Sequence, residues 1–395
     1  MKVQLERLCA FFSFVARGAY ILVLGCAGSM ALAAPPASAP VPGVSDSQIV
    51  IGISIPLSGP VGKNGSEFLA GANMVFDRVN SAGGIFGRKI VPEVIDDAYQ
   101  PAKTADNVRT LVNDKQVFAV FGVLGTDNTN EGLKITTPKG VPFLFPVTGD
   151  AAMRREPNRY FFTISASLPE EMDKIVEHLL TVGVQRIAVA HFDNGFGRSL
   201  LEATQRSMKQ RGAELAAAVP FDVDAKNAPA AAQKIAAAKP AAIILASLGK
   251  SSADFIEAYR KGGGDAAIYS FSGVGSDQLI QRLGAGSRGI VISQNMPSPW
   301  SNAESSARDY RALKAAAKET NYSYLNMRGY ISATVLVEAL KRAGKAPTRE
   351  GLVDAVESMH HMDIGGFPVD FSKERHHGSQ FVELTVISGN GTFIK

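Results

Sequence analysis

Hydrophobic positions follow two patterns along most of this chain. Some segments are short, unbroken apolar runs, and others carry apolar residues every three or four positions. The unbroken runs, such as Val117 to Phe121, predict strands buried on both faces of a parallel sheet. The spaced pattern, as in 66–80 with Phe68, Ala72 and Val75 on one face, predicts amphipathic helices.

The two patterns alternate through most of the chain. We expect strands at 49–56, 89–95, 117–121, 142–145, 186–192, 214–221, 241–247, 267–271, 367–371 and 380–388. We expect helices at 66–80, 101–114, near 130, and at 170–182, 198–211, 228–238, 252–261, 303–320, 326–342 and 348–358. Such alternation indicates βαβ units and parallel sheets. The units are too many for one modest domain, so we predict an α/β fold with two lobes of like architecture.

The N-terminus has the pattern of an export signal. Lys2 and Arg7 give a basic start, residues 18–32 are apolar and small, and Ala31-Leu-Ala33 offers a cleavage site. We therefore expect a signal peptide over 1–33 and export to the periplasm.

A flexible Ala/Pro-rich lead-in over 34–47 is expected to follow. A competing cleavage site, similar to the bacterial lipoprotein box, ends at Cys26 and would leave a lipid anchor there. Both cysteines, Cys9 and Cys26, precede residue 34. A chain cut at that point has none, which excludes disulfides, thiol catalysis and cysteine metal sites.

Composition narrows the class of protein. The 395 residues are 46% hydrophobic and 20% charged, which is typical of a globular protein with its own hydrophobic cores. The formal net charge is +4, and half of it lies in the predicted signal peptide. Because positive and negative charges nearly balance, the composition gives no indication of a nucleic-acid-binding surface.

Small polar residues follow the predicted strand at 117–121 at once. Gly122 and Gly125 permit a tight turn, and Thr126 and Asp127 stand just before a predicted helix. In open α/β sheets, ligands bind beyond the carboxyl ends of the strands, and a helix N-terminus attracts anions. A helix N-cap without a ligand explains the same residues equally well, so this stretch alone leaves both interpretations open.

Catalytic and metal-binding patterns are weak. His191 and Asp193 could act as an acid/base pair, but no nucleophile in a recognisable context accompanies them, which favours a strand-end loop that lines a cleft. The pairs His360-His361 and His376-His377 are more typical of solvated histidines than of a metal site. The stretch 272–275 lacks the third glycine of a dinucleotide site. We predict no catalytic residue, no cofactor and no metal.

Several segments, taken together, resemble the leucine/isoleucine/valine-binding protein family, the periplasmic substrate-binding components of ABC transporters. They run in order from about Gln48 to the C-terminus: Leu57-Ser-Gly-Pro-Val-Gly62, Asn80-Ser-Ala-Gly-Gly-Ile-Phe-Gly-Arg88, Asp96-Asp-Ala-Tyr-Gln-Pro101, residues 117–129, and Asp193-Asn-Gly-Phe-Gly197. The resemblance implies a type I periplasmic binding fold, in which two Rossmann-like lobes with parallel sheets are joined by a three-strand hinge. By it, lobe 1 holds 48–165 and 296–377, and lobe 2 holds 166–295 and 378–395.

The resemblance also implies residues that bind the ligand. Thr126 falls where the family uses a hydroxyl for the ligand's carboxylate, Leu124 where a backbone carbonyl serves, and Thr148 near a second hydroxyl. Asn64 occupies an aromatic position of the family, and Phe196 takes the place of a cleft tyrosine.

One departure from the family affects the ligand. Ser272 sits where amino-acid binders of the family carry a glutamate that pairs with the ligand's ammonium group. A buried ammonium without a counter-charge costs several kcal/mol. Either another acid, such as Asp127, Asp150 or Asp193, replaces it, or the ligand has no amine.

The sequence therefore predicts an exported solute receptor that is not an enzyme. We expect a monomer that binds a small carboxylate-bearing molecule between its lobes and delivers it to a membrane permease. The ligand is a branched-chain or other hydrophobic amino acid, or an amine-free aromatic or aliphatic acid. The alternative is a ligand-sensing subunit of the same fold that acts on a signalling partner.

Overall fold

The computed structural model describes residues 40–155 and 158–394. The predicted signal peptide, both cysteines and the first part of the predicted lead-in lie outside the described residues. Among the helices within these ranges, none combines the length and the apolar character that a membrane span needs.

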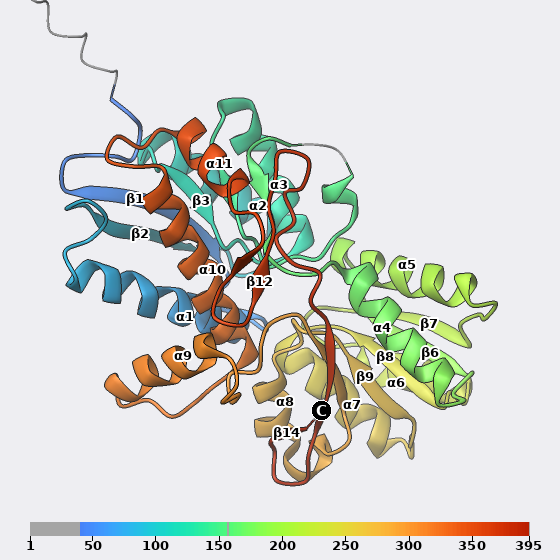
Figure 1. The fold of residues 1–395 in the computed structure, drawn as a ribbon. Coiled ribbons are helices and arrows are strands. Elements are labelled where there is room, and N and C mark those ends of the chain that lie inside the picture. Colours follow the sequence, from blue (N-terminus) through green and yellow to red (C-terminus); the bar gives the residue numbers. More distant parts are fainter. Residues whose placement is uncertain (1–39, 156–157, 395) are drawn as a thin grey trace, which may run out of the picture. The chain divides into compact units, whose positions relative to one another are not determined.

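Two sheets organise the chain, and the strands that alternate with helices run parallel in both (Figure 1). The first sheet has the order β2-β1-β3-β4-β5, with β1 (Gln48–Ile55), β2 (Lys89–Asp96), β3 (Ala119–Phe121), β4 (Phe143–Leu144) and β5 (Phe161–Phe162). The second has the order β14-β13-β10-β9-β8-β6-β7, with β6 (Ile187–Phe192), β7 (Ala217–Phe221), β8 (Ala242–Ala246), β9 (Ala267–Ser270), β10 (Val291–Gln294), β13 (Glu383–Ile387) and β14 (Phe393–Ile394). Only β13 and β14 run antiparallel to their neighbours in these two sheets as described. The predicted α/β class with parallel sheets in two lobes is confirmed.

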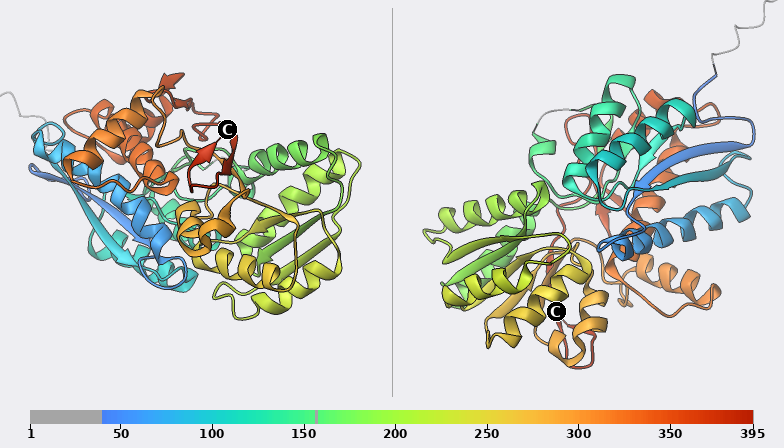
Figure 2. Two further views of the ribbon diagram at one scale, coloured as in Figure 1. Left: turned by 90° about the horizontal axis from the view of Figure 1, so that it is seen from below. Right: turned by 180° about the vertical axis from the view of Figure 1, so that it is seen from behind.

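Helices cover both faces of each sheet (Figure 2). Those of the first lobe are α1 (Gly62–Ser81), α2 (Pro101–Arg109), α3 (Thr126–Thr136), α9 (Ser305–Ala316), α10 (Tyr324–Arg342) and α11 (Arg349–Glu357). Those of the second are α4 (Leu168–Thr181), α5 (Gly195–Gln210), α6 (Ala228–Ala237), α7 (Gly249–Lys261) and α8 (Ser276–Leu283). Helix α1 packs on α10, α2 on α3, α4 on α5, and α6 on α7. Each sheet is thus buried on two sides, which is why its strands read as unbroken apolar runs.

The chain passes from one sheet to the other three times: between β5 and β6, between β10 and α9, and between β13 and the small hairpin of β11 (Met362–Asp363) and β12 (Pro368–Val369). The hairpin belongs with the first lobe, because Phe371, just after β12, packs against Phe145 and Phe162. Each lobe is therefore built from separate parts of the sequence.

Helix α10 approaches α1 very closely. A Cβ atom on Gly71 would lie 1.9 Å from the backbone oxygen of Asn326, and one on Gly329 would lie 1.9 Å from that of Phe68. Only glycine fits at these two positions, so the helices meet backbone to backbone. This contact fixes the height of α10 over the first sheet, and with it the place of Arg328, the residue before Gly329.

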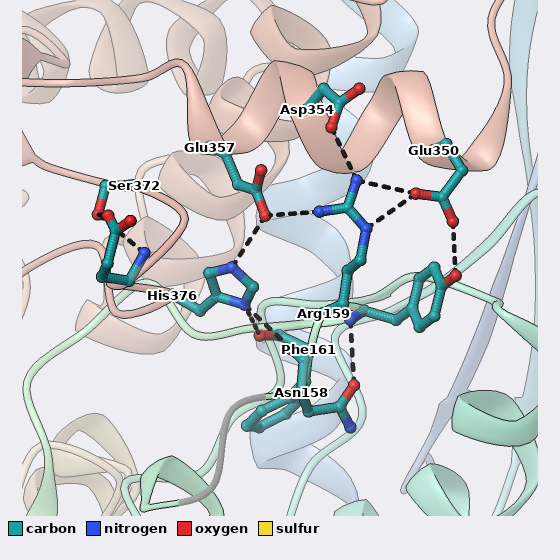
Figure 3. Close-up of polar contacts among 10 residues, drawn as sticks. Asn158, Arg159, Phe161, Glu350, Asp354, Glu357, Ser372 and His376 are labelled. Atoms are coloured by element: carbon teal, nitrogen blue, oxygen red, sulfur yellow. Dashed lines mark hydrogen bonds and ion pairs between the residues drawn. The ribbon is translucent and has the colours of Figure 1, made fainter.

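A polar cluster joins the loop before β5 to α11 (Figure 3). The guanidinium group of Arg159 lies 2.8 Å from Glu350, 2.8 Å from Asp354 and 3.1 Å from Glu357. His376 Nε2 lies 3.2 Å from the same Glu357 oxygen. We call these five residues the Arg159 cluster. It ties the C-terminal helix of the first lobe to the edge of the first sheet.

Candidate functional site

A cavity lies among the carboxyl ends of strands from both sheets, where loops after β2, β3 and β4 meet loops after β6, β8, β9 and β10. We call it the strand-end cavity. Its apolar lining comes from Leu124, Leu168, Phe196, Leu248, Phe271 and Leu325. Its polar lining comes from Thr126, Thr148, Glu171, Ser272, Asn295 and Arg328. The free space is about 30 Å³, room for about two water molecules.

Two threonines of the first lobe form a hydroxyl pair in this cavity. Thr126 opens α3, and its Oγ1 lies 3.0 Å from Oγ1 of Thr148, in the loop after β4. The preceding Gly125 has a φ of 107°, and a Cβ there would lie 2.7 Å from the ring of Tyr99. The turn thus needs glycine to bring the start of α3 into the cavity. Two hydroxyls beside a helix N-terminus suit a carboxylate.

A buried carboxylate, that of Glu171 on α4, also lines the cavity. Oε1 accepts hydrogen bonds from Ser272 Oγ (2.9 Å) and Asn295 Nδ2 (2.9 Å). Oε2 accepts from Ser272 N (3.0 Å) and Ser293 Oγ (2.6 Å). Burial raises the pKa of Glu171 above its ordinary value, and the bonds from Ser293 and Ser272 oppose that rise. All four donors belong to the second lobe, so the carboxylate holds the ends of β9 and β10 together.

Arg328 brings a guanidinium group into the lining from α10. Its Nη2 donates to Ser165 Oγ at 2.8 Å and reaches Pro146 O at 3.5 Å, while its Nε is buried without a hydrogen-bond partner. Among the described residues, no carboxylate oxygen lies within ion-pair distance of it. Burial lowers the pKa of Arg328 to about 10, and the charge of Glu171 opposes this.

The structure brings five of the predicted ligand-binding residues into one lining: Leu124, Thr126, Thr148, Phe196 and Ser272. Ser272 does not face the cavity as a free hydroxyl, because its Oγ donates to Glu171. The backbone at Leu124 forms a bridge with Val147, in the loop after β4. These residues are separated widely in sequence but meet at the strand ends.

Asn64 lies outside the lining. Helix α1 begins at Gly62, four residues before its predicted start, so Asn64 is helical. Its Nδ2 donates to Gly273 O at 3.0 Å, and its Oδ1 accepts from Gln278 Nε2 at 2.8 Å. Asn64 therefore links the first lobe to the loop and helix that follow β9.

The three predicted amine anchors also lie outside the lining. Asp127 Oδ2 accepts from the backbone N–H of Gly195 at 2.8 Å, so this carboxylate caps the start of α5. Asp150 Oδ1 accepts from Ala152 N at 2.6 Å. Asp193 is exposed and lies 3.4 Å from a guanidinium nitrogen of Arg198. Each aspartate already has a partner within the protein, and none belongs to the lining of the strand-end cavity.

Glu171 and Arg328 were not among the site residues predicted from the sequence, although the sequence pattern around each of them is unusual. Glu171 follows Leu168 by three residues and precedes Ile175 by four, which places an acid on the apolar face of its helix. Arg328 stands within a run from Tyr324 to Ala333 in which every residue is buried. Charged residues on buried faces are rare unless they are paired, so each position is a candidate for function.

Comparison with known proteins agrees with this arrangement. The sequence model of the periplasmic binding protein family matches residues 48–392. The chain belongs to this family. The leucine-specific-binding protein of Salmonella typhimurium is 25% identical over 320 residues, which cover 77% of this chain and 82% of that protein. A leucine-, isoleucine-, valine-, threonine- and alanine-binding protein of Pseudomonas aeruginosa is 22% identical over 301 residues, covering 75% of this chain and 79% of that protein.

A solved structure is similar throughout. The substrate-binding periplasmic protein of Ralstonia solanacearum is 32% identical, has a TM-score of 0.83, and covers 88% of this chain and 99% of its own. The resemblance to the leucine/isoleucine/valine-binding proteins is thereby confirmed, with the type I periplasmic binding fold. Periplasmic binding proteins are solute receptors, not enzymes. Among the described residues, no group of three or more His, Cys, Asp or Glu is placed to hold a metal ion.

Proposed function

We propose that this periplasmic binding protein is the exported receptor of an ABC importer. It binds a small molecule with a carboxylate and a hydrophobic body in the strand-end cavity and delivers it to the membrane permease. The body is that of a branched-chain or other hydrophobic amino acid, or of an amine-free aromatic or aliphatic acid. The observation that carries the proposal is the Thr126–Thr148 hydroxyl pair at a helix N-terminus, enclosed by leucine and phenylalanine side chains.

The composition of the cavity supports this class of ligand. The hydroxyls of Thr126 and Thr148 can each donate to a carboxylate oxygen, and so can the N–H groups of the first turn of α3. The apolar side chains around them remove a hydrocarbon body from water. The relatives from Salmonella typhimurium and Pseudomonas aeruginosa are named for binding leucine and similar amino acids, which agrees with a hydrophobic body.

Contacts between the lobes support a receptor that opens and closes. Asp127 bonds to Gly195, and Asn64 bonds to Gly273 and Gln278. With about 30 Å³ free, a ligand enters only when these bonds break and the lobes separate. We propose that the hinge lies near Ser165, Met296-Pro297 and Gly378, and that the closed lobes form the surface that the permease binds.

The test is identification of the molecule that co-purifies with the exported protein, by mass spectrometry under native conditions, followed by calorimetric titration. We expect one small carboxylate per monomer. Replacement of Thr126 and Thr148 by valine, which removes both hydroxyls at nearly constant volume, should weaken binding by about tenfold or more. Turnover of the bound molecule by the purified protein, or unchanged affinity in the double variant, would contradict the proposal.

The mass of the exported chain tests localisation. A cleaved signal peptide leaves an N-terminus at Ala34 without modification, whereas processing at Cys26 leaves a lipid-modified cysteine. We expect the former.

A further inference from the structure

The strand-end cavity contains one feature that the hydroxyl pair does not require, which is the buried guanidinium group of Arg328. Resting on the function proposed above, we infer that Arg328 is the counter-charge of the ligand's carboxylate and that the ligand class is a hydrophobic acid without an amine.

The buried guanidinium group of Arg328 has an incomplete set of hydrogen-bond partners. The residue is only 5% exposed, yet its Nε has no partner, and the one short bond of its Nη2 goes to a neutral hydroxyl, that of Ser165. A buried charge without an ionic partner is costly, and a guanidinium group matches a carboxylate with two parallel N–H donors. Among the described residues no carboxylate forms an ion pair with this guanidinium group, and the charge of Glu171 acts on it only from beyond ion-pair distance. The cavity that Arg328 lines is where an anion can come into direct contact with it.

A contact with the loop after β4 helps to position Arg328 in the cavity lining. Nη2 of Arg328 reaches the carbonyl oxygen of Pro146, and two residues later in the same loop the chain presents Thr148. The guanidinium group therefore contacts, from α10, the same first-lobe loop that carries Thr148. A carboxylate held by the Thr126–Thr148 pair has the guanidinium group on its own side of the cavity. The backbone contact of Gly329 with Phe68 keeps α10 at the height that this requires.

The charged residues of the lining decide whether the cavity can hold an amine. Glu171 and Arg328 are the two residues in the described lining that carry a formal charge. An ionised Glu171 already accepts four hydrogen bonds from the second lobe, so an ammonium group would have to displace a donor. A protonated Glu171 has no charge to offer. In both states the cavity supplies a free cationic donor and no free counter-charge for a cation.

The experiment compares matched pairs of probes on the full exported protein by isothermal titration calorimetry. Leucine and 4-methylpentanoate differ only in the amine, as do phenylalanine and 3-phenylpropanoate. We expect at least one acid to bind about tenfold or more tightly than its amino acid, because the ammonium would be buried without a partner. An amino acid that binds more tightly than its acid in both pairs would overturn the ligand class but leave the proposed receptor function intact.

A variant isolates the guanidinium group. For Arg328→Gln we expect a 10- to 100-fold loss of affinity for the acid, because hydrogen bonds to a charged partner are lost. The neutral carboxamide of the same acid should bind wild type and variant almost equally, a difference that a merely structural role would not produce. Arg328→Lys should retain part of the affinity. Arg159→Gln, which alters an arginine outside the cavity lining, is the matched control and should leave all affinities unchanged.

An equal loss for the acid and its carboxamide in Arg328→Gln would overturn the role of Arg328. If that variant does not fold, as judged by circular dichroism, the acid-to-amino-acid ratio of the wild-type protein still decides the ligand class, and Arg328→Lys decides the role of the residue. Absence of binding by every probe, together with no small molecule in the purified protein, would overturn the proposed function itself.

Discussion

Two arginines of the first lobe show how pairing separates a structural charge from a binding one. Arg159 is 42% exposed and has three carboxylates around it (Figure 3). Hydrogen bonds from its guanidinium to Asp354 and Glu350 raise its pKa. Arg328 is buried, has no carboxylate within ion-pair distance among the described residues, and has its pKa lowered by burial.

The two arginines differ in where their anionic partner comes from. In the Arg159 cluster the carboxylates are supplied by α11, so the group is complete and its effect is to hold α11 in place. Beside Arg328 the chain supplies a hydroxyl and a carbonyl, and the strand-end cavity lies on the remaining side. An incomplete set of partners next to a cavity points to a ligand, whereas a complete set at the surface points to stability.

The largest effect on this comparison should come from Glu171→Ala. Removal of the carboxylate leaves the N–H of Ser272 and the amide of Asn295 as buried donors without an acceptor, and it removes the charge that faces Arg328. We expect the free energy of unfolding to fall by about 3–5 kcal/mol, measured by urea denaturation. Glu350→Ala in the exposed Arg159 cluster is the control, with an expected loss of about 1 kcal/mol or less. Similar losses of stability in both variants would contradict the distinction between the buried carboxylate of Glu171 and the exposed Arg159 cluster.

An intermediate effect is expected from the carboxyl group of Glu67, which faces a like charge and should make the stability depend on pH. Burial, and then the nearby charge of Asp277, raise the pKa of Glu67 from its ordinary value of 4.5 to about 7. Between these values the folded protein holds more protons than the unfolded chain, so stability should fall as the pH rises from 4.5 to 7 and then level off. The change should be on the order of 2 kcal/mol.

Urea denaturation of wild type and Glu67→Gln across this pH range tests the shift. The variant should lose this part of the pH dependence, and Asp277→Asn should reduce it, because Glu67 would then face no like charge. Lys63, 3.7 Å from Glu67 and 3.5 Å from Asp277, is too exposed to cancel the effect. An unchanged slope in Glu67→Gln would contradict the prediction.

The smallest effect should come from Arg159→Gln. Its ion pairs are partly exposed, so their loss should cost about 1 kcal/mol or less and shrink further in high salt. Thermal unfolding at low and high salt measures this. Loss of ligand binding in this variant, at unchanged stability, would contradict the assignment of a structural role to Arg159 and a binding role to Arg328.

The sequence predicted those elements whose apolar residues face the interior of the sheets. The strands that became β1, β2, β6 and β8 were placed within one or two residues, because parallel strands covered on both faces are apolar throughout. The prediction missed the two-residue strands β5, β11 and β14, and also two longer elements, α8 and β10. In β10 the last two residues, Ser293 and Gln294, are polar but buried, and they donate hydrogen bonds to Glu171 and Thr385 in distant parts of the chain. Helix α8 buries only Ser276 and Leu279, too little to form a clear apolar face.

The sequence by itself determined the alternation of strands and helices, the two parallel sheets, and the hydroxyl of Thr126 at a strand end, because these depend on neighbours within a few residues. Tertiary structure alone decided which charges enter the cavity. The partner of Ser272 is 101 residues away, at Glu171, and that of Arg328 is 163 residues away, at Ser165. Side-chain pairing at such separations depends on where folded elements meet, so it cannot be predicted from the local sequence pattern.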